Sequence, residues 1–189
     1  LVFGELVQQL YADAVLIETD IGIQNLTAAE ADTLAAIDAG ADTILEATFR
    51  AGEYRVLTNV IQRLADDSWH LIEVKSATKV KRAHIPDLAF QRYVIELSGY
   101  RVSKCSVLHA NTTGRLPDVA SLFTEVDVTD QVTAYLPSVA SNLFPLSSFS
   151  DTGSVIPDML VNKVCVGFFF HAPCLLGTDH PSISHTIVV

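Results

Sequence analysis

The sequence has few of the residues that hold very small or membrane-bound proteins together. Its three cysteines, Cys105, Cys165 and Cys174, cannot all pair with one another, and a chain of 189 residues can build a core without disulfides. The most apolar run, 159–176, contains a lysine and a histidine and falls short of a clean membrane-spanning segment. We therefore expect no disulfide framework, no membrane partner and a cytoplasmic location.

The composition is that of a folded chain. Apolar residues make up 49% of the sequence and the mean hydropathy is +0.33, which excludes a largely disordered protein. No basic segment followed by an apolar stretch stands at the start, so we see no signal peptide and expect a fragment of a longer product. The length predicts a core over 1–115, a helical extension over 116–150 and a tail of uncertain structure over 151–189.

Positive charge is scarce and unevenly distributed. The net charge is −10, yet residues 54–115 carry ten basic and five acidic side chains, whereas the segments on either side carry one basic residue each. The basic middle third is either a solvated charged face or a surface for a polyanion.

The hydrophobic pattern predicts two helices, three strands, a helix and a fourth strand. Short connections between the three strands favour an antiparallel meander. We expect Thr27 to cap the second helix and Gly40 to end it, and Thr129 or Asp130 to cap a helix running toward Asn142. The predicted strands are 43–49, 54–63, 69–77 and 100–110, and the helix between the last two is 86–98. The fold class is thus α/β of the α+β type, with a central mixed sheet flanked by helices.

Charged residues interrupt the apolar strand 69–77 in a regular way. Because side chains alternate along a strand, Glu73 and Lys75 project from one face together with Leu71. Antiparallel pairing would bring Asn59, at mid-length of the preceding strand, beside Glu73. Two oxygen ligands with a lysine two residues beyond one of them favour a Mg²⁺ site acting on phosphate.

The block from Leu71 to Val94 resembles the PD-(D/E)xK nuclease superfamily. The residues EVKS after an apolar strand, the preceding VLTNVIQR and the following DLAFQRYV are similar to its RecB-like branch, which includes CRISPR-associated exonucleases, and closest to an uncharacterised bacterial family of nuclease-like domains. The resemblance spans roughly 3–143 and implies a restriction-endonuclease-like core. It also implies a DNA partner, single-stranded or with duplex ends, and a Mg²⁺ or Mn²⁺ cofactor.

The resemblance implies a role for individual residues. Glu73 would be the second metal-binding acid, Lys75 the catalytic lysine and Gln91 a supporting glutamine. Because Gln91 lies seven residues after His84 and four after Asp87, all three can face one side of their helix. Tyr93 would be a supporting aromatic residue. The basic residues just beyond the site, where a phosphate backbone would lie, are candidates for DNA contact: Lys79, Lys81 and Arg82.

Two positions depart from the family pattern. Asn59 stands where an aspartate binds metal in the family, so Glu46 is our first candidate for a compensating acid and Glu5 the second. The C-terminal part contains only Cys165 and Cys174, so we expect no iron–sulfur cluster, which needs four thiolates. Three readings stay open: a metal-dependent DNA nuclease domain, a catalytically impaired nucleic-acid-binding module of the same fold, and a protein-assembly domain.

Overall fold

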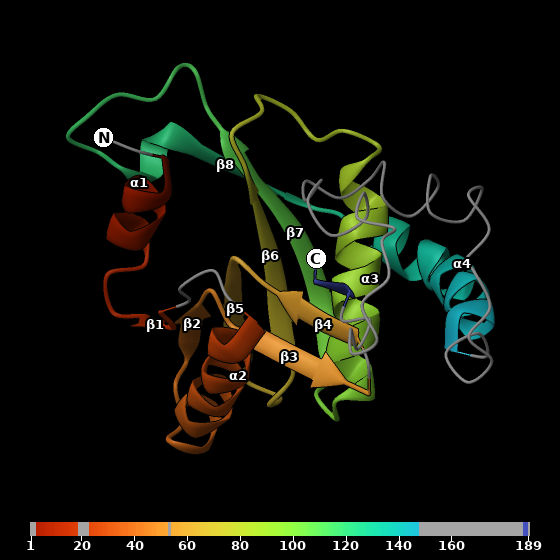
Figure 1. Cartoon of the computed structure of the whole chain (residues 1–189). Helices are drawn as coiled ribbons and strands as arrows, with labels where there is room; N and C mark the ends of the chain where they lie inside the picture. The colour runs from red at the N-terminus through yellow and green to blue at the C-terminus, as the bar shows by residue number, and fades with distance from the viewer. Residues whose placement is uncertain (1–2, 19–22, 53, 148–186, 189) are drawn as a thin grey trace, which may run out of the picture.

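A computed structural model describes residues 3–18, 23–52, 54–147 and 187–188 (Figure 1). The tail predicted over 151–189 lies outside the described residues except for its last short strand, and so do Cys165 and Cys174. The elements in chain order are α1 (Phe3–Leu10), β1 (Val15–Leu16), α2 (Ile23–Asp38), β2 (Thr43–Leu45), β3 (Thr48–Ala51), β4 (Tyr54–Leu57), β5 (Val60–Arg63), β6 (Trp69–Lys75), α3 (His84–Leu97), β7 (Val102–Ala110), the 3-10 turn η1 (Ala120–Leu122), β8 (Phe123–Asp127), α4 (Thr129–Ser147) and β9 (Ile187–Val188).

The larger sheet has six strands in the order β1-β2-β5-β6-β7-β8. β2, β5 and β6 pair antiparallel as a meander, whereas β6 and β7 pair in parallel, with α3 as the crossover between them. β8 pairs antiparallel with β7. The predicted α/β class with a central mixed sheet flanked by helices is confirmed.

The first two predicted strands are each broken in the middle, so only their inner halves, β2 and β5, form one sheet with β6 as predicted. Glu46 has a φ of +56°, which turns the chain out of β2. At the same level Thr58 donates its backbone N–H to Ala47 O at 2.9 Å, and Glu46 donates its own to Asn59 O at 3.0 Å. The outer halves of both strands therefore leave the sheet together as the β3–β4 hairpin, which forms a second sheet with β9.

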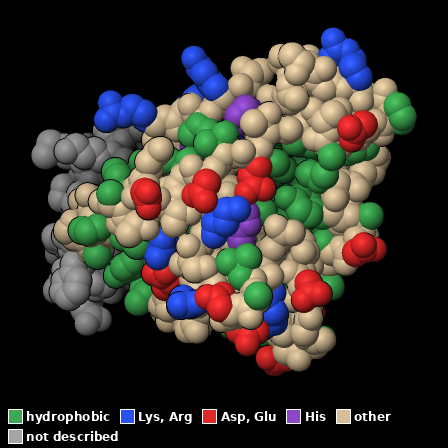
Figure 2. Space-filling view, turned by 180° about the vertical axis from the view of Figure 1, so that it is seen from behind, with side chains coloured by type: hydrophobic (Ala, Val, Ile, Leu, Met, Phe, Trp, Pro, Cys, Tyr) green, Lys and Arg blue, Asp and Glu red, His purple; other side chains and the backbone are tan. Residues whose placement is uncertain are grey.

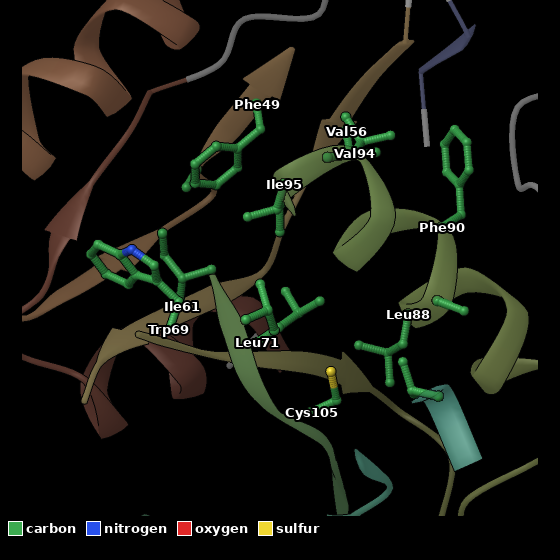
Figure 3. Close-up of a cluster of buried hydrophobic side chains, with 14 of the residues drawn as sticks. Phe49, Val56, Ile61, Trp69, Leu71, Leu88, Phe90, Val94, Ile95 and Cys105 are labelled. Atoms are coloured by element: carbon green, nitrogen blue, oxygen red, sulfur yellow. The ribbon is translucent and has the colours of Figure 1, made fainter. Parts of the chain in front are cut away.

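The main core lies on the face of the sheet that carries Leu71 (Figure 3). Leu71 is fully buried against side chains from α3, and Phe49 and Val56 of the β3–β4 hairpin belong to the same cluster. Trp69 belongs to the same cluster and is covered by the guanidinium of Arg63, 4.7 Å from the ring centroid. This packing fixes α3 against β6, which matters because both elements carry candidate site residues.

A second core lies on the other face of the sheet. It contains Ile72, Leu108 and Phe123 from the strands and Val7 from α1. Because Leu71 and Ile72 belong to different clusters, the predicted alternation of faces along β6 is confirmed. The side of the molecule opposite the view of Figure 1 carries mixed acidic and basic side chains with hydrophobic ones between them (Figure 2).

Several element boundaries differ from the sequence prediction. α2 begins at Ile23, so Thr27 lies inside the helix and does not cap it, whereas Gly40 follows the helix with φ +82° as expected. α4 begins at Thr129, so Thr129 and Asp130 lie inside the helix and do not cap it. The first N–H of the helix instead donates to the Asp127 carboxylate at 2.9 Å, which satisfies an orphan donor. The segment predicted as a helical extension also supplies β8 to the sheet.

Candidate active site at the carboxyl end of β6

The break between β4 and β5 places Asn59 beside Glu73. Asn59 directly precedes β5, whereas we predicted it at mid-length of the strand. Because Val60 pairs with Ile72 in an antiparallel register, the residue before Val60 lies opposite Glu73. Its Oδ1 accepts the backbone N–H of Val74 at 2.9 Å. The predicted neighbourhood of Asn59 and Glu73 is therefore present, and the amide oxygen ties two strands together.

Glu73 is a buried carboxylate with both oxygens engaged. Its side chain is 9% exposed; Oε1 lies 2.7 Å from Lys75 Nζ, and Oε2 accepts Gln91 Nε2–H at 2.9 Å. Gln91 is itself buried, and its Oε1 has no hydrogen-bond partner among the described residues. A buried carboxylate needs such partners, and β6 and α3 together supply them.

Lys75, the last residue of β6, lies between two carboxylates. Besides Glu73, it is 3.7 Å from Asp87 Oδ2 in the first turn of α3. Burial alone would lower the pKa of Lys75, but attraction to Glu73 and Asp87 outweighs it and leaves the pKa raised. At neutral pH Lys75 is therefore an ammonium ion that can stabilise negative charge, and not a general base.

Glu46 is the second carboxylate near Glu73. Burial raises its pKa, a hydrogen bond from the Asn59 side chain lowers it, and the negative charge of Glu73 raises it further. Since the Asn59 oxygen faces Val74, its amide N–H faces Glu46. Glu5, the other acid considered, lies on α1, which packs on the opposite face of the sheet.

The donor set fits a hard divalent cation held by two carboxylates. Burial is the main reason that the pKa of Glu46 is raised, and repulsion by Glu73 adds to it. Mg²⁺ commonly binds through one or two carboxylates, with waters and phosphate oxygens completing its shell. The described parts of the chain contain no group of three or more Asp, Glu, His or Cys side chains arranged around a common metal position. Asn59 supports Glu46 and β6 through hydrogen bonds and adds no charge.

His84 begins α3 and borders the same site. Its Nδ1 accepts the Lys81 backbone N–H at 3.2 Å, and burial together with the nearby Lys75 ammonium lowers its pKa. His84 is therefore neutral at pH 7 with its proton on Nε2. With Asp87 and Gln91 it confirms the prediction that all three face one side of the helix.

The side chains of Tyr93 and of the three basic residues make none of these contacts. Tyr93 packs against the main core. Lys79, Lys81 and Arg82 are exposed on the loop 76–83, which joins β6 to α3 and, in Figure 1, rises above the same end of the sheet as the loop 111–119. The exposed cations thus lie at the rim of the site. A hollow of about 560 Å³ opens elsewhere, between β1 and α2.

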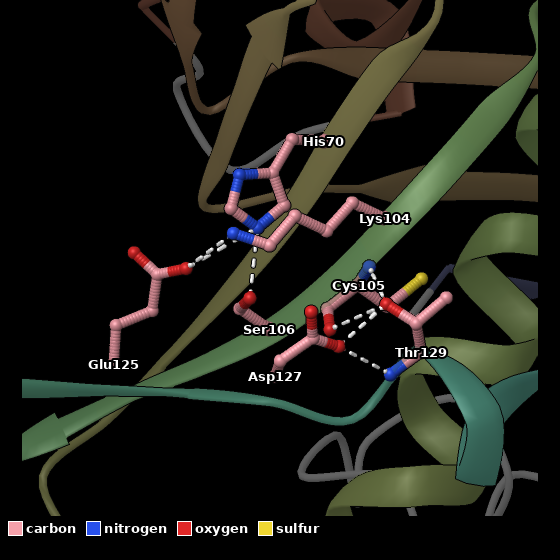
Figure 4. A network of polar contacts seen from close by, with 7 residues as sticks. All are labelled: His70, Lys104, Cys105, Ser106, Glu125, Asp127 and Thr129. Atoms are coloured by element: carbon pink, nitrogen blue, oxygen red, sulfur yellow. Dashed lines mark hydrogen bonds and ion pairs between the residues drawn. The ribbon is translucent and has the colours of Figure 1, made fainter.

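A second polar network occupies the other face of β6 and β7 and was not predicted from the sequence (Figure 4). His70 Nε2 lies 2.8 Å from Ser106 Oγ, and Lys104 Nζ donates to Glu125 at 3.2 Å. Burial and the neighbouring Lys104 lower the pKa of His70 to about 4, although Glu125 and Asp127 act in the opposite direction. His70 is therefore neutral in the folded protein at pH 7.

Acidification should destabilise the protein through His70. The folded-state pKa lies below the unfolded value of 6.5, so the stabilisation is complete above pH 6.5 and is lost as the pH falls toward 4. With allowance for solvent screening, we expect His70→Asn to remove about 2 kcal/mol of this pH dependence. Urea unfolding at pH 7, 6, 5 and 4 measures it. Equal pH slopes in the two proteins would contradict the assignment.

The sequence signals for the missed residues were weak. Helical spacing placed Asp87 on one face with His84 and Gln91, but nothing in the sequence predicted its ion pair with Lys75. His70 and Ser106 are separated by 36 positions, and nothing local predicts their contact.

Comparison of the chain with protein-family models, with curated proteins and with solved structures finds no significant match. In the parts of the chain that the structure describes, no helix has the length and apolarity needed to span a membrane.

Proposed function

We propose that this chain is a metal-dependent DNA nuclease domain that hydrolyses phosphodiester bonds. The observation that carries the proposal is the meeting of Glu46, Asn59, Glu73 and Lys75 at the carboxyl end of β6, beside a loop with three exposed cations. Two carboxylates that can hold a cation, an ammonium ion and a basic rim suit the binding and hydrolysis of a polyanion.

Each residue has a distinct part in the proposed reaction. A bound Mg²⁺ or Mn²⁺ would supply Lewis-acid polarisation of the phosphate and a more acidic water. Glu46 and Glu73 would hold the cation, while Gln91 keeps Glu73 in its orientation through the 2.9 Å hydrogen bond. Lys75 would stabilise charge that develops on the phosphate oxygens, because it is protonated and close to Glu73.

One observation favours the alternative of a catalytically impaired nucleic-acid-binding module. Without any cation, Glu73 is already paired with Lys75 and Gln91, and Glu46 accepts from Asn59. A site neutralised by its own side chains has less need of a metal. The basic loop would then bind nucleic acid without cleavage.

The experiment that separates these functions is an assay of linear double-stranded and single-stranded DNA with Mg²⁺ or Mn²⁺. Cleavage that stops with EDTA and is lost on substitution of Glu73 supports the nuclease. DNA binding without cleavage supports the impaired module, and an absence of both supports the protein-assembly reading.

The exposed cations give a separate prediction about binding. We expect the combined substitution of Lys79, Lys81 and Arg82 by Ala to weaken DNA affinity about 10-fold or more at low salt, because each phosphate contact releases counterions. The slope of log K against log salt should fall by up to about 3 for duplex DNA. Fluorescence anisotropy at several salt concentrations measures both quantities.

A matched control removes the same charge elsewhere. The control residues lie away from the loop 76–83. Arg50 is on β3, Arg101 directly precedes β7, and Lys104 is on β7. Their combined replacement by Ala should leave the salt slope closer to that of the parent. Equal slopes for both triple variants would remove the basic loop from the interface.

A further inference from the structure

Lys75 is held by two carboxylates from two different elements. Glu73 Oε1, two residues earlier on β6, lies 2.7 Å from Nζ, and Asp87 Oδ2, in the first turn of α3, lies 3.7 Å away. The Lys75 side chain is 29% exposed and that of Asp87 16%, so the second pair is partly shielded from water. Only one of these carboxylates is a proposed cation ligand.

The spacing of residues on α3 matches the spacing on β6. Two residues of a strand span about 6.6 Å, and four residues of a helix span about 6 Å. Asp87 therefore reaches Lys75 while Gln91, one turn later, reaches Glu73, with α3 running antiparallel to β6. Each of the two charged residues of the strand has its own partner on the helix.

The two partners of Lys75 differ in what happens when a cation binds. Glu73 accepts from Gln91 at Oε2 and pairs with Lys75 at Oε1, so a divalent ion bound to Glu73 would share its negative charge and weaken its attraction to Lys75. Asp87 is not a proposed cation ligand, and its ion pair with Lys75 is the side-chain contact that the described residues show for it. With a cation on Glu73, Asp87 would be the partner of Lys75 whose full charge still attracts the ammonium ion.

We propose that Asp87 is a positioning residue, a second counter-ion that keeps the Lys75 ammonium at the site when Glu73 turns to a bound cation. The inference rests on the proposed function for its role in hydrolysis, but the ion pair itself can be tested without any activity. A merely structural role for Asp87 would stabilise α3 and leave the protonation of Lys75 unchanged.

The test is NMR titration of the lysine ammonium groups. The sequence has five lysines, so the Lys75 signal in ¹³C-lysine-labelled protein can be assigned with Lys75→Arg. We expect Asp87→Asn to lower the pKa of Lys75, and Asp87→Glu, which keeps the charge, to restore most of it. Glu96→Gln is the control, since Glu96 pairs with Arg92 at 2.9 Å on the same helix and its loss should leave Lys75 as it is.

Activity provides the second measurement. In the pH profile of kcat, the basic limb of Asp87→Asn should move to lower pH, so the ratio of the parent rate to the variant rate should rise as the pH increases from 7 toward 10. An unchanged Lys75 pKa in well-folded Asp87→Asn would overturn the inference. If the parent cleaves no DNA, the proposed function fails, while the titration alone still decides whether Asp87 holds Lys75.

Discussion

Glu73→Ala and Lys75→Ala should each reduce DNA cleavage by about 100- to 1,000-fold, the range seen when one group that stabilises a transition-state charge is removed. Glu73→Ala removes the carboxylate that meets both Lys75 and Gln91. Lys75→Ala removes the ammonium ion beside it. Rates on linear DNA with saturating Mg²⁺ measure the loss.

Conservative variants separate chemistry from folding. Glu73→Ala leaves the buried Gln91 amide without its acceptor, which costs about 1–3 kcal/mol of stability. Glu73→Gln and Lys75→Met keep the shape of the side chains, so their thermal stability should stay nearer to that of the parent while cleavage is still lost. Unimpaired cleavage by folded Glu73→Ala would refute the placement of the site.

Lys104→Ala is the matched control for the lysine. Lys104 also donates to a carboxylate, Glu125 at 3.2 Å, but from the other face of the sheet. Cleavage by this variant should remain within a few-fold of the parent. An equal loss in Lys75→Ala and Lys104→Ala would indicate a general effect of charge and not a catalytic role.

The sequence predicted the site where the evidence was local. Alternation along β6 placed Leu71 and Glu73 on one face, and the short turn before β6 set Asn59 opposite Glu73. Helical spacing placed Asp87 and Gln91 on one side of α3. These are contacts fixed by a period or by a tight connection, which the order of residues determines directly.

The features that were missed depend on distant parts of the chain. Nothing in the run 43–49 shows that Glu46 adopts a φ of +56°, because the conformation is held by backbone bonding to Asn59 across the break. The pairing of β8 with β7 likewise brings together segments that no short turn connects. Long-range pairing of this kind is decided by packing of the whole sheet and not by local propensity.

The role of Asn59 could be predicted only in part. Its place opposite Glu73 followed from register, but the hydrogen bonds that it makes did not. One amide serves two groups: its oxygen accepts from Val74 and its N–H donates to Glu46. An aspartate could make the first bond and not the second. Without a cation, asparagine at position 59 stabilises the Glu46 carboxylate by a hydrogen bond, whereas aspartate would repel it. With a cation bound, aspartate would add a negatively charged ligand.

Asn59→Asp should make stability and activity depend on Mg²⁺. Without a divalent ion, the variant loses the donor to Glu46 and adds a third carboxylate beside Glu46 and Glu73, so we expect a loss of about 1–3 kcal/mol in the free energy of unfolding. Added Mg²⁺ should recover this loss, because binding to the folded state stabilises it by RT ln(1 + [Mg²⁺]/Kd). Thermal unfolding with EDTA and with increasing Mg²⁺ measures both effects.

The cleavage assay of the same variant distinguishes an active nuclease from an impaired one. A formal charge at position 59 strengthens cation binding, so Asn59→Asp should cleave DNA at lower Mg²⁺ concentrations than the parent. Gln62→Glu, which adds a carboxylate three residues further along the chain on β5, is the control and should not alter the Mg²⁺ dependence. Clear cleavage by Asn59→Asp with none by the parent would identify a site impaired by its asparagine. If Mg²⁺ stabilises neither protein and neither cleaves, Glu46 and Glu73 do not form a cation site. In that case even the added carboxylate of Asn59→Asp, which increases the repulsion that a cation would relieve, has not produced Mg²⁺ binding.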